Sequence, residues 1–232
     1  MKEEQQNILK HQPKALGQKY LVNLKYRKYF RKTSLKQKGV GDFFLNEVKK
    51  ISPRTILEVG VFHGVTARNL CELLFKIHSK NFKYIGIDLF EESEENSSEV
   101  IPNTVFSNPI KNIYFKFIKK QNPYSKSAVN DLLKKFSDNV NLIKGNSHVV
   151  LKKIDMSKID FVFLDGGHSY ETVKNDLECC LEVVTKSNGV IMCDDYNFGH
   201  LPDVKIAIDE FTNKNNFKCE ILCSGRFAKI YK

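Results

Sequence analysis

The feature that most constrains the fold is a regular alternation of short apolar strands and amphipathic helices that begins at residue 55. Strands are expected at 55–59, 84–88, 140–144, 159–165, 189–195, 218–223 and 227–231. Strands that alternate with helices form a parallel, doubly wound sheet with helices on both faces. The last two strands are separated only by Ser224-Gly225, which indicates an antiparallel hairpin. The sequence therefore predicts one α/β domain over residues 51–232.

Composition excludes several other classes of protein. The 232 residues are 41% hydrophobic and 28% charged, as in ordinary globular proteins. No run approaches the roughly 18 apolar residues of a membrane span, and residues 1–6 have no apolar signal core. The six cysteines lie mostly in apolar runs and form no C-x-x-C pair, which favours buried thiols over disulfides or zinc ligands. A cytoplasmic location is expected.

Positive charge is concentrated at the N-terminus. The net charge of the chain is +10, and residues 1–50 hold 13 Lys and Arg against 4 Asp and Glu. This segment is rich in tyrosine and predicts a basic helical extension, with a second short helix at 43–50. It either binds nucleic-acid phosphates or packs as a solvated helix on a neighbouring subunit. The neutral charge of the remaining chain favours homo-oligomer contacts over nucleic acid.

Residues 89–138 interrupt the alternation of strands and helices. They begin with five glutamates, contain three prolines and end in an expected helix near 127–136. An insertion of this length is usually a lid or binding loop, or is mobile. Because it follows the end of a strand, where ligands bind in such sheets, a lid-like insertion is favoured.

Short polar residues gather at the ends of the expected strands, where open α/β sheets bind their ligands. They are Glu58, Gly60, Gly64, Asp88, Gly145, Asn146, Ser147, Asp165, Asp194 and Asp195. Gly60 and Gly64 would let the backbone approach a ligand, and Thr66 would cap the helix that follows. These glycines do not form G-x-G-x-x-G, which disfavours a dinucleotide. Asp88 can accept both hydroxyls of a ribose, and a ribose without a pyrophosphate suggests S-adenosylmethionine.

Two motifs resemble a known family. Glu58-x-Gly60-x-x-x-Gly64-x-Thr66 and Tyr84-Ile-Gly-Ile-Asp88 resemble motifs I and II of class I S-adenosylmethionine-dependent methyltransferases. The runs 159–170 and 189–196 resemble the branch of macrocin-type sugar O-methyltransferases and cephalosporin-hydroxylase-like proteins. The resemblance covers residues 53–232. It implies a Rossmann-like, mostly parallel seven-stranded sheet of order 3-2-1-4-5-7-6 with the last strand antiparallel. It also implies that Glu58, Gly60, Gly64, Asp88 and Ser147 surround the cofactor, where Asn146 and Asp165 are expected too.

Three carboxylates follow the two adjacent strands 159–165 and 189–195. Asp165, Asp194 and Asp195 would repel one another unless a cation lay between them, and oxygen ligands suit Mg²⁺, Mn²⁺ or Ca²⁺. The resembling branch uses these positions as metal ligands, with Mg²⁺ expected. In the alternative, Asp194 caps the following turn and Asp165 contacts only the cofactor.

His168 stands three residues beyond Asp165 and is the expected general base. A histidine with an ordinary pKa of about 6.5 could accept a proton from an acceptor hydroxyl made more acidic by the metal. The alternative is that His168 only caps the helix that starts at Ser169.

The resulting hypothesis is a metal-dependent O-methyltransferase that acts on a sugar or another small hydroxyl-bearing molecule. The other hypothesis is an RNA methyltransferase that uses the basic N-terminal segment to bind its substrate.

Overall fold

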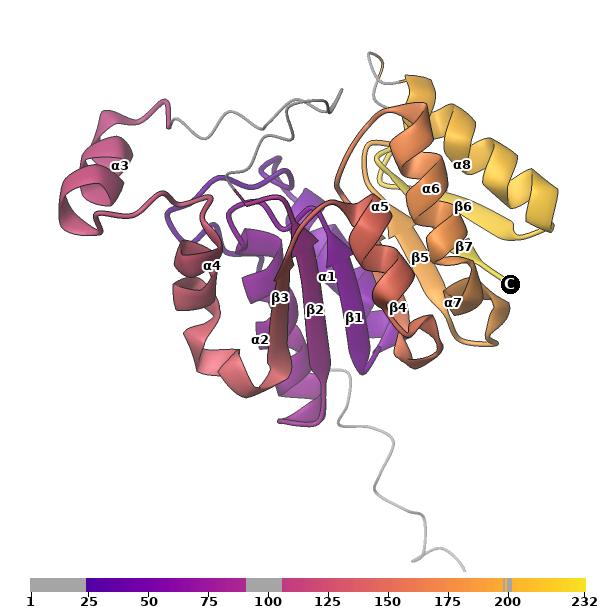
Figure 1. The fold of residues 1–232 in the computed structure, drawn as a ribbon, viewed down its shortest axis with the longest axis horizontal. Coiled ribbons are helices and arrows are strands. Elements are labelled where there is room, and N and C mark those ends of the chain that lie inside the picture. The colour runs from indigo at the N-terminus through magenta and orange to yellow at the C-terminus, as the bar shows by residue number, and fades with distance from the viewer. Residues whose placement is uncertain (1–23, 91–105, 198, 200–201) are drawn as a thin grey trace, which may run out of the picture.

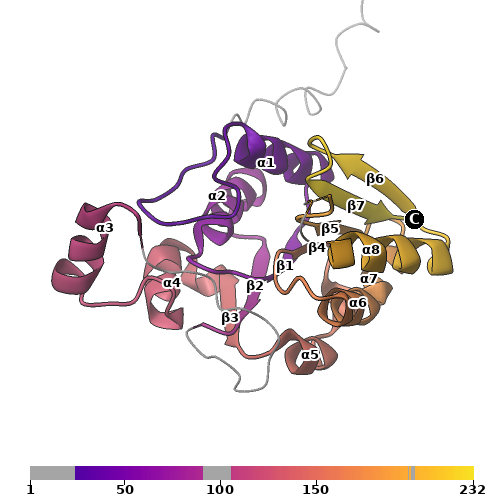
Figure 2. The same ribbon diagram turned by 90° about the horizontal axis from the view of Figure 1, so that it is seen from above.

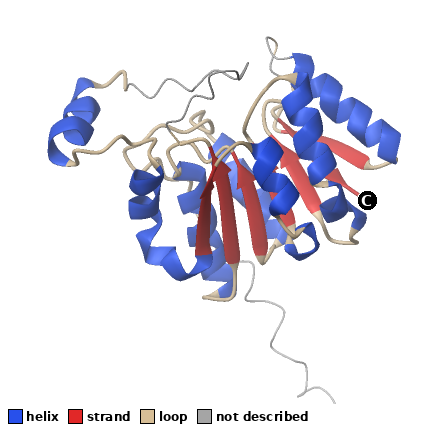
Figure 3. Cartoon of the chain, in the orientation of Figure 1, coloured by secondary structure: helices blue, strands red, loops and turns tan. Residues whose placement is uncertain are grey.

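A single seven-stranded sheet forms the centre of the protein (Figure 3). The computed structural model describes residues 24–90, 106–197, 199 and 202–232. The strands are β1 (Thr55–Val59), β2 (Lys83–Asp88), β3 (Val140–Lys144), β4 (Phe161–Leu164), β5 (Val190–Cys193), β6 (Lys218–Leu222) and β7 (Phe227–Tyr231). Their order is β3-β2-β1-β4-β5-β7-β6. Strands β1 to β5 are parallel, and β7 is antiparallel to both β5 and β6. The predicted Rossmann-like fold and strand order are confirmed.

Helices cover both faces of the sheet (Figures 1 and 2). One face carries α1 (Val40–Ile51) and α2 (Val65–His78), and the other carries α5 (Ser147–Val150), α6 (Tyr170–Cys179), α7 (Leu181–Thr185) and α8 (Pro202–Asn215). The apolar residues Tyr170, Val173, Leu177, Leu181 and Val184 keep helical spacing, which predicts one helix. The chain instead breaks at Cys180, between α6 and α7. None of the described helices is both long and apolar enough to cross a bilayer.

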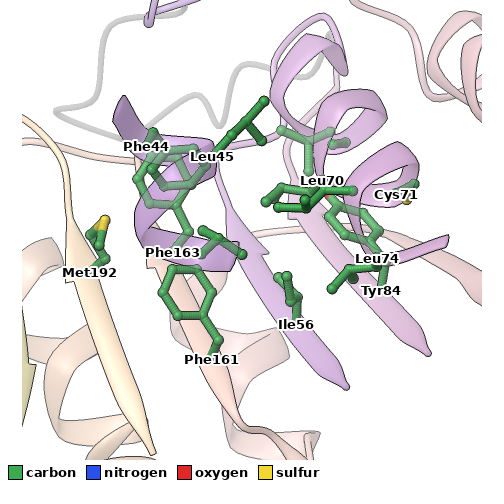
Figure 4. Packing of buried hydrophobic residues seen from close by; sticks show 14 of the residues in the cluster. Phe44, Leu45, Ile56, Leu70, Cys71, Leu74, Tyr84, Phe161, Phe163 and Met192 are labelled. Atoms are coloured by element: carbon green, nitrogen blue, oxygen red, sulfur yellow. The ribbon is translucent and has the colours of Figure 1, made fainter. Parts of the chain in front are cut away.

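Side chains that alternate along each strand divide the interior into two cores. Phe161 and Phe163 of β4 point to the side of α1, where the ring of Phe163 lies 4.5 Å from that of Phe44 (Figure 4). Val162, between them in the sequence, packs with Leu177 of α6 on the opposite face. Successive side chains of a strand point to opposite faces, so a strand buried on both sides must be apolar throughout.

The described part of the N-terminal segment differs from its prediction, while residues 1–23 lie outside the described residues. Residues 24–39 form turns and extended chain rather than a helix, whereas the short helix expected at 43–50 is present as α1. The backbone N–H of Tyr26 donates to Asp42, and that of Arg27 donates to Asn69 of α2. Because side chains of other elements take up these backbone groups, the segment lies across the domain instead of closing helical hydrogen bonds on itself.

The insertion between β2 and β3 is partly described, since its acidic residues 91–105 lie outside the described part. The remainder forms α3 (Pro109–Ile113), a π-helical stretch (Tyr114–Ile118), α4 (Lys126–Leu133) and a 3-10 stretch (Lys134–Asn139). Val129 of α4 joins the core beside α2. In contrast, α3 stands away from the body of the domain (Figure 1).

Candidate active site

Three carboxylates meet where β4 and β5 end side by side. Asp165 follows β4, and Asp194 and Asp195 follow β5. One oxygen from each lies within 4.8 Å of the other two. With His168 they line a cavity of about 20 Å³, which is enough for a single water molecule or ion. The structure therefore brings together the three residues that the sequence assigned to a metal.

Arg226 partly neutralises this group, and sequence reasoning did not identify it. It precedes β7, and its Nε and Nη2 each donate to Asp194 over 2.6 Å. Its Nη2 also lies 3.4 Å from Asp195. Three carboxylates and one guanidinium leave a formal charge of −2, which a divalent cation would balance. The residues present thus fit an oxygen-ligated divalent metal. Asp194 also accepts from the N–H of Asp195 in the following turn, so it bonds both to that turn and to Arg226.

Asp165 contacts the N-terminal segment. The hydroxyl of Ser34 donates to its Oδ2 over 2.6 Å. Burial, followed by the neighbouring charge of Asp194, raises the pKa of Asp165 well above its usual value. Because an isolated carboxylate is costly to ionise in such a place, a cation and the Ser34 bond would both favour its charged form.

His168 lies beside the carboxylates rather than in a helix cap. Its Nε2 is 3.3 Å from Oδ2 of Asp195. The N-cap of α6 is Ser169, whose hydroxyl accepts from the N–H of Thr172. The structure thus contradicts the alternative in which His168 only caps this helix. Asp195 itself has a φ of 56°, a backbone conformation that is uncommon outside glycine and is often found at functional sites.

Asp88 ends β2 and accepts three hydrogen bonds. The N–H of Phe62 donates to Oδ2 over 2.7 Å, and the N–H of Phe90 donates to Oδ1 over 2.9 Å. The third donor is the hydroxyl of Tyr124, 2.7 Å from Oδ1. Tyr124 belongs to the insertion and lies just before α4. The insertion thus covers the carboxylate expected to hold the ribose.

Glu58 of β1 is fully buried. Its Oε2 accepts from the hydroxyl of Tyr84 over 2.6 Å, while Oε1 is buried without a hydrogen-bond partner among the described residues. Burial raises the pKa of Glu58 from 4.5 to about 8. An orphaned buried oxygen at the end of β1 is consistent with a ligand or water that completes the site.

The glycine turn after β1 is required by packing. Gly60 and Gly64 have φ values of 90° and 72°. A Cβ on Gly60 would lie 2.0 Å from the carbonyl oxygen of Asp165, and one on Gly64 would lie 2.7 Å from Val129. Thr66 does not cap α2, because the N-cap is Gly64 and the Thr66 hydroxyl bonds to that of Tyr26. The expected capping role of Thr66 is wrong.

The turn after β3 adjoins Asp88. The N–H of Gly145 donates to the carbonyl oxygen of Asp88 over 3.0 Å. Asn146 caps α5 by accepting from the N–H of His148, and Ser147 is the first residue of that helix. Asn146 and Ser147 therefore lie at the same edge of the sheet as Asp88 and Asp165, as the sequence predicted from the strand ends.

A family model described as a methyltransferase domain matches residues 57–196, which is more than half of the chain and includes every strand-end residue from Glu58 to Asp195. The chain belongs to this methyltransferase family. It is a class I S-adenosylmethionine-dependent methyltransferase, which confirms the family predicted from the motifs. No match was found among curated proteins.

Solved methyltransferases share the fold. The O-methyltransferase NovP is 16% identical with a TM-score of 0.59, over 83% of this chain and 81% of that one. CalS11, a TDP-rhamnose 3'-O-methyltransferase of calicheamicin biosynthesis, is 16% identical with a TM-score of 0.55, over 85% and 81%. The methyltransferase PaMTH1 of Podospora anserina, solved with S-adenosylhomocysteine, is 16% identical with a TM-score of 0.55, over 84% and 78%.

Three residues that contact the candidate site were not identified from the sequence. Ser34, Tyr124 and Arg226 come from the N-terminal segment, the insertion and the terminal hairpin. Each lies dozens of residues from its partner. An arginine before the last strand is the one feature that the predicted strand order could have singled out, because that order places it beside β5.

Proposed function

We propose that this methyltransferase transfers a methyl group to a hydroxyl of a small acceptor, a sugar or a glycosylated metabolite, with the help of a divalent cation. The observation that carries the proposal is the convergence of Asp165, Asp194 and Asp195 with His168 on one small cavity. The O-methyltransferase NovP and the TDP-rhamnose 3'-O-methyltransferase CalS11 share the fold and support an oxygen acceptor.

Residues at the ends of β1, β2 and β3 would hold the cofactor. Asp88 would accept the ribose hydroxyls, and the turn with Gly60 and Gly64 would lie beside the amino-acid portion, above Glu58. Thr66, Asn146, Ser147 and Asp165 complete the cofactor residues proposed from the sequence. S-adenosylmethionine, when bound, supplies an electrophilic sulfonium methyl group and leaves as S-adenosylhomocysteine.

The carboxylates would hold the cation, with Mg²⁺ expected and Mn²⁺ or Ca²⁺ possible substitutes. A divalent cation, when bound there, would supply Lewis-acid charge that makes a nearby acceptor hydroxyl more acidic. Arg226 orients Asp194 through its two hydrogen bonds, and Ser34 orients Asp165. These contacts hold the ligand oxygens in place before any acceptor arrives, which reduces the entropy lost on binding.

His168 would accept the proton of the acceptor hydroxyl. Its imidazole lies against Asp195, so the positive charge gained with the proton would be stabilised by a carboxylate 3.3 Å away. The oxygen, relieved of its proton, would then attack the methyl group in line. The main contribution of the chain to the rate would be positioning.

The test is transfer of an isotopically labelled methyl group from S-adenosylmethionine to a panel of nucleotide sugars, free sugars and glycosylated phenols. We expect a product with one acceptor class, abolished by EDTA and restored by Mg²⁺ or Mn²⁺. Full turnover by metal-stripped protein would contradict the metal. Labelling of RNA with no labelled small molecule would favour the RNA methyltransferase hypothesis.

A further inference from the structure

Two chain segments form a protruding surface whose exposed side chains take no part in the proposed reaction. We propose that it binds the face of an anionic lipid bilayer. The surface, here called the basic apolar surface, consists of the exposed side chains of residues 24–38 and residues 106–120. In Figure 1 its most distant part is α3 with the helical turns that follow it.

Large apolar side chains are exposed on this surface. Ile110 is 66% exposed, Phe117 61% and Ile118 70%, and Ile113 and Phe30 are about half exposed. Ile110, Ile113 and Phe117 are spaced three and four residues apart, so they lie along one side of the helical stretch. Such a concentration of exposed apolar side chains indicates an interaction site.

The charge of the same surface has one sign. Residues 24–38 contain seven Lys or Arg, of which Arg31 is buried, and residues 106–120 contain four Lys. Neither range contains an Asp or Glu. Basic side chains beside exposed apolar ones are typical of helices that lie in the interface of an anionic membrane. Binding of nucleic acid would account for the positive charge but would leave the three exposed isoleucines and two exposed phenylalanines without a role.

The two segments form one surface. The ring of Phe30 meets that of Tyr114 edge-on, with centroids 5.6 Å apart, and the ammonium of Lys111 lies 4.8 Å from the Phe30 ring centre. Tyr29 and Phe30 have φ values of 47° and 58°, so the backbone bears strain while it presents Phe30 to solvent. Arg31 fixes this turn by donating to the carbonyl oxygens of Pro123 and Ala128.

A cavity beside this surface is also lined by aromatic and basic side chains. This cavity of about 600 Å³ is lined by Phe30, Tyr114, Arg68 and Lys119, among others, with Asp131 as its single carboxylate. Arg68 is paired with Glu72, so Arg31 and Lys119 supply the positive charge that would attract lipid phosphate or carboxylate groups. Because residues 24–38 also reach the active site through Ser34, a bilayer bound here would lie on the side of the molecule where the strands end.

The test is co-sedimentation of the full chain with vesicles. We expect retention on vesicles of equal parts phosphatidylcholine and phosphatidylglycerol, weakened by salt, and none on phosphatidylcholine alone. The double variant Phe117→Ser, Ile118→Ser should bind at least roughly tenfold more weakly, because it removes the apolar part of the contact. Lys116→Gln with Lys119→Gln should weaken binding by a similar factor.

Matched variants elsewhere should bind like the wild type. Ile206→Ser removes an exposed isoleucine of α8, and Lys152→Gln with Lys153→Gln removes two exposed lysines after α5. Equal loss in these controls, or no retention of the wild type on anionic vesicles, would overturn the proposal. Two other outcomes would also overturn it. One is retention on RNA but not on vesicles, and the other is self-association that Phe117→Ser abolishes while vesicle binding is absent.

Discussion

At the scale of single residues, the crowding of Asp88 has a consequence for cofactor binding. A carboxylate offers about four lone-pair directions, and Phe62, Phe90 and Tyr124 already use three of them. The two hydroxyls of a ribose need two. One present donor must therefore leave, and the side chain of Tyr124 can move more easily than a backbone N–H.

Replacing Tyr124 by Phe should strengthen S-adenosylhomocysteine binding by roughly threefold to tenfold, because a competing hydrogen bond worth about 1 kcal/mol is removed. Calorimetry of the two proteins measures this. Tyr170→Phe is the matched control, since that hydroxyl bonds to Glu210 instead. Weaker binding in Tyr124→Phe would mean that the hydroxyl contacts the cofactor and does not compete with it.

Glu58 should make the protein less stable as pH rises. Burial raises its pKa from 4.5 to about 8 in the folded protein, so the folded state retains a proton that the unfolded state loses in this range. The contribution of Glu58 to the free energy of unfolding is therefore largest below pH 4.5 and decreases progressively up to about pH 8. Glu58→Gln should flatten this dependence in urea titrations, while Glu182→Gln, an exposed control, should not. An unchanged slope in Glu58→Gln would assign the dependence to another group.

The candidate site was predictable at strand ends and unpredictable elsewhere. Asp88, Asp165 and Asp195 were identified because each ends an apolar strand, and the carboxyl ends of parallel strands share one edge. Tyr124 lies in a loop whose path depends on packing against Phe62 and Phe90. Neither this packing nor the hydrogen bond from Ser34 to Asp165 produces a periodic pattern in the sequence.

At the scale of elements, the segment 24–39 acts as a clamp over the loops of the site. Tyr26 bonds through its hydroxyl to Thr66, Arg31 to carbonyls of the insertion, and Ser34 to Asp165. It had been predicted as a helix because its basic and aromatic residues suit one. The helix propensity of these residues does not decide their structure, because polar groups of α2 and of the insertion form hydrogen bonds with the extended segment.

Arg31→Met should destabilise the fold by about 2–4 kcal/mol, because it leaves buried carbonyl groups without donors. Urea unfolding followed by circular dichroism measures this. Arg27→Met removes an exposed arginine from the same segment and should change stability by less than about 0.5 kcal/mol. Equal stability of the two variants would show that the segment does not clamp the loops.

The helices and strands themselves followed from periodicity. β1, β3 and β7 begin and end at the predicted residues, because apolar runs bounded by polar residues mark strands buried in a sheet. The break at Cys180 could not be foreseen, since the apolar spacing continues through it. It arises where the chain turns between α6 and α7 to follow the sheet.

At the scale of the whole molecule, the fold brings five polar strand ends to one edge and joins them to segments from both ends of the chain. Ser34 and Arg226 are separated by most of the sequence, yet both bond to the carboxylate group. The site therefore exists only in the complete fold. Its formal charge of −2 is the physical reason to expect a divalent cation.

Binding of Mn²⁺ to the full chain tests this account most directly, because it needs no knowledge of the acceptor. Electron paramagnetic resonance should detect one bound Mn²⁺ per chain, displaced by Mg²⁺. Asp165→Asn and Asp195→Asn should each abolish binding, while Asp138→Asn, an exposed aspartate, should leave it intact. A folded wild-type protein that binds no Mn²⁺, with or without S-adenosylhomocysteine, would contradict the account.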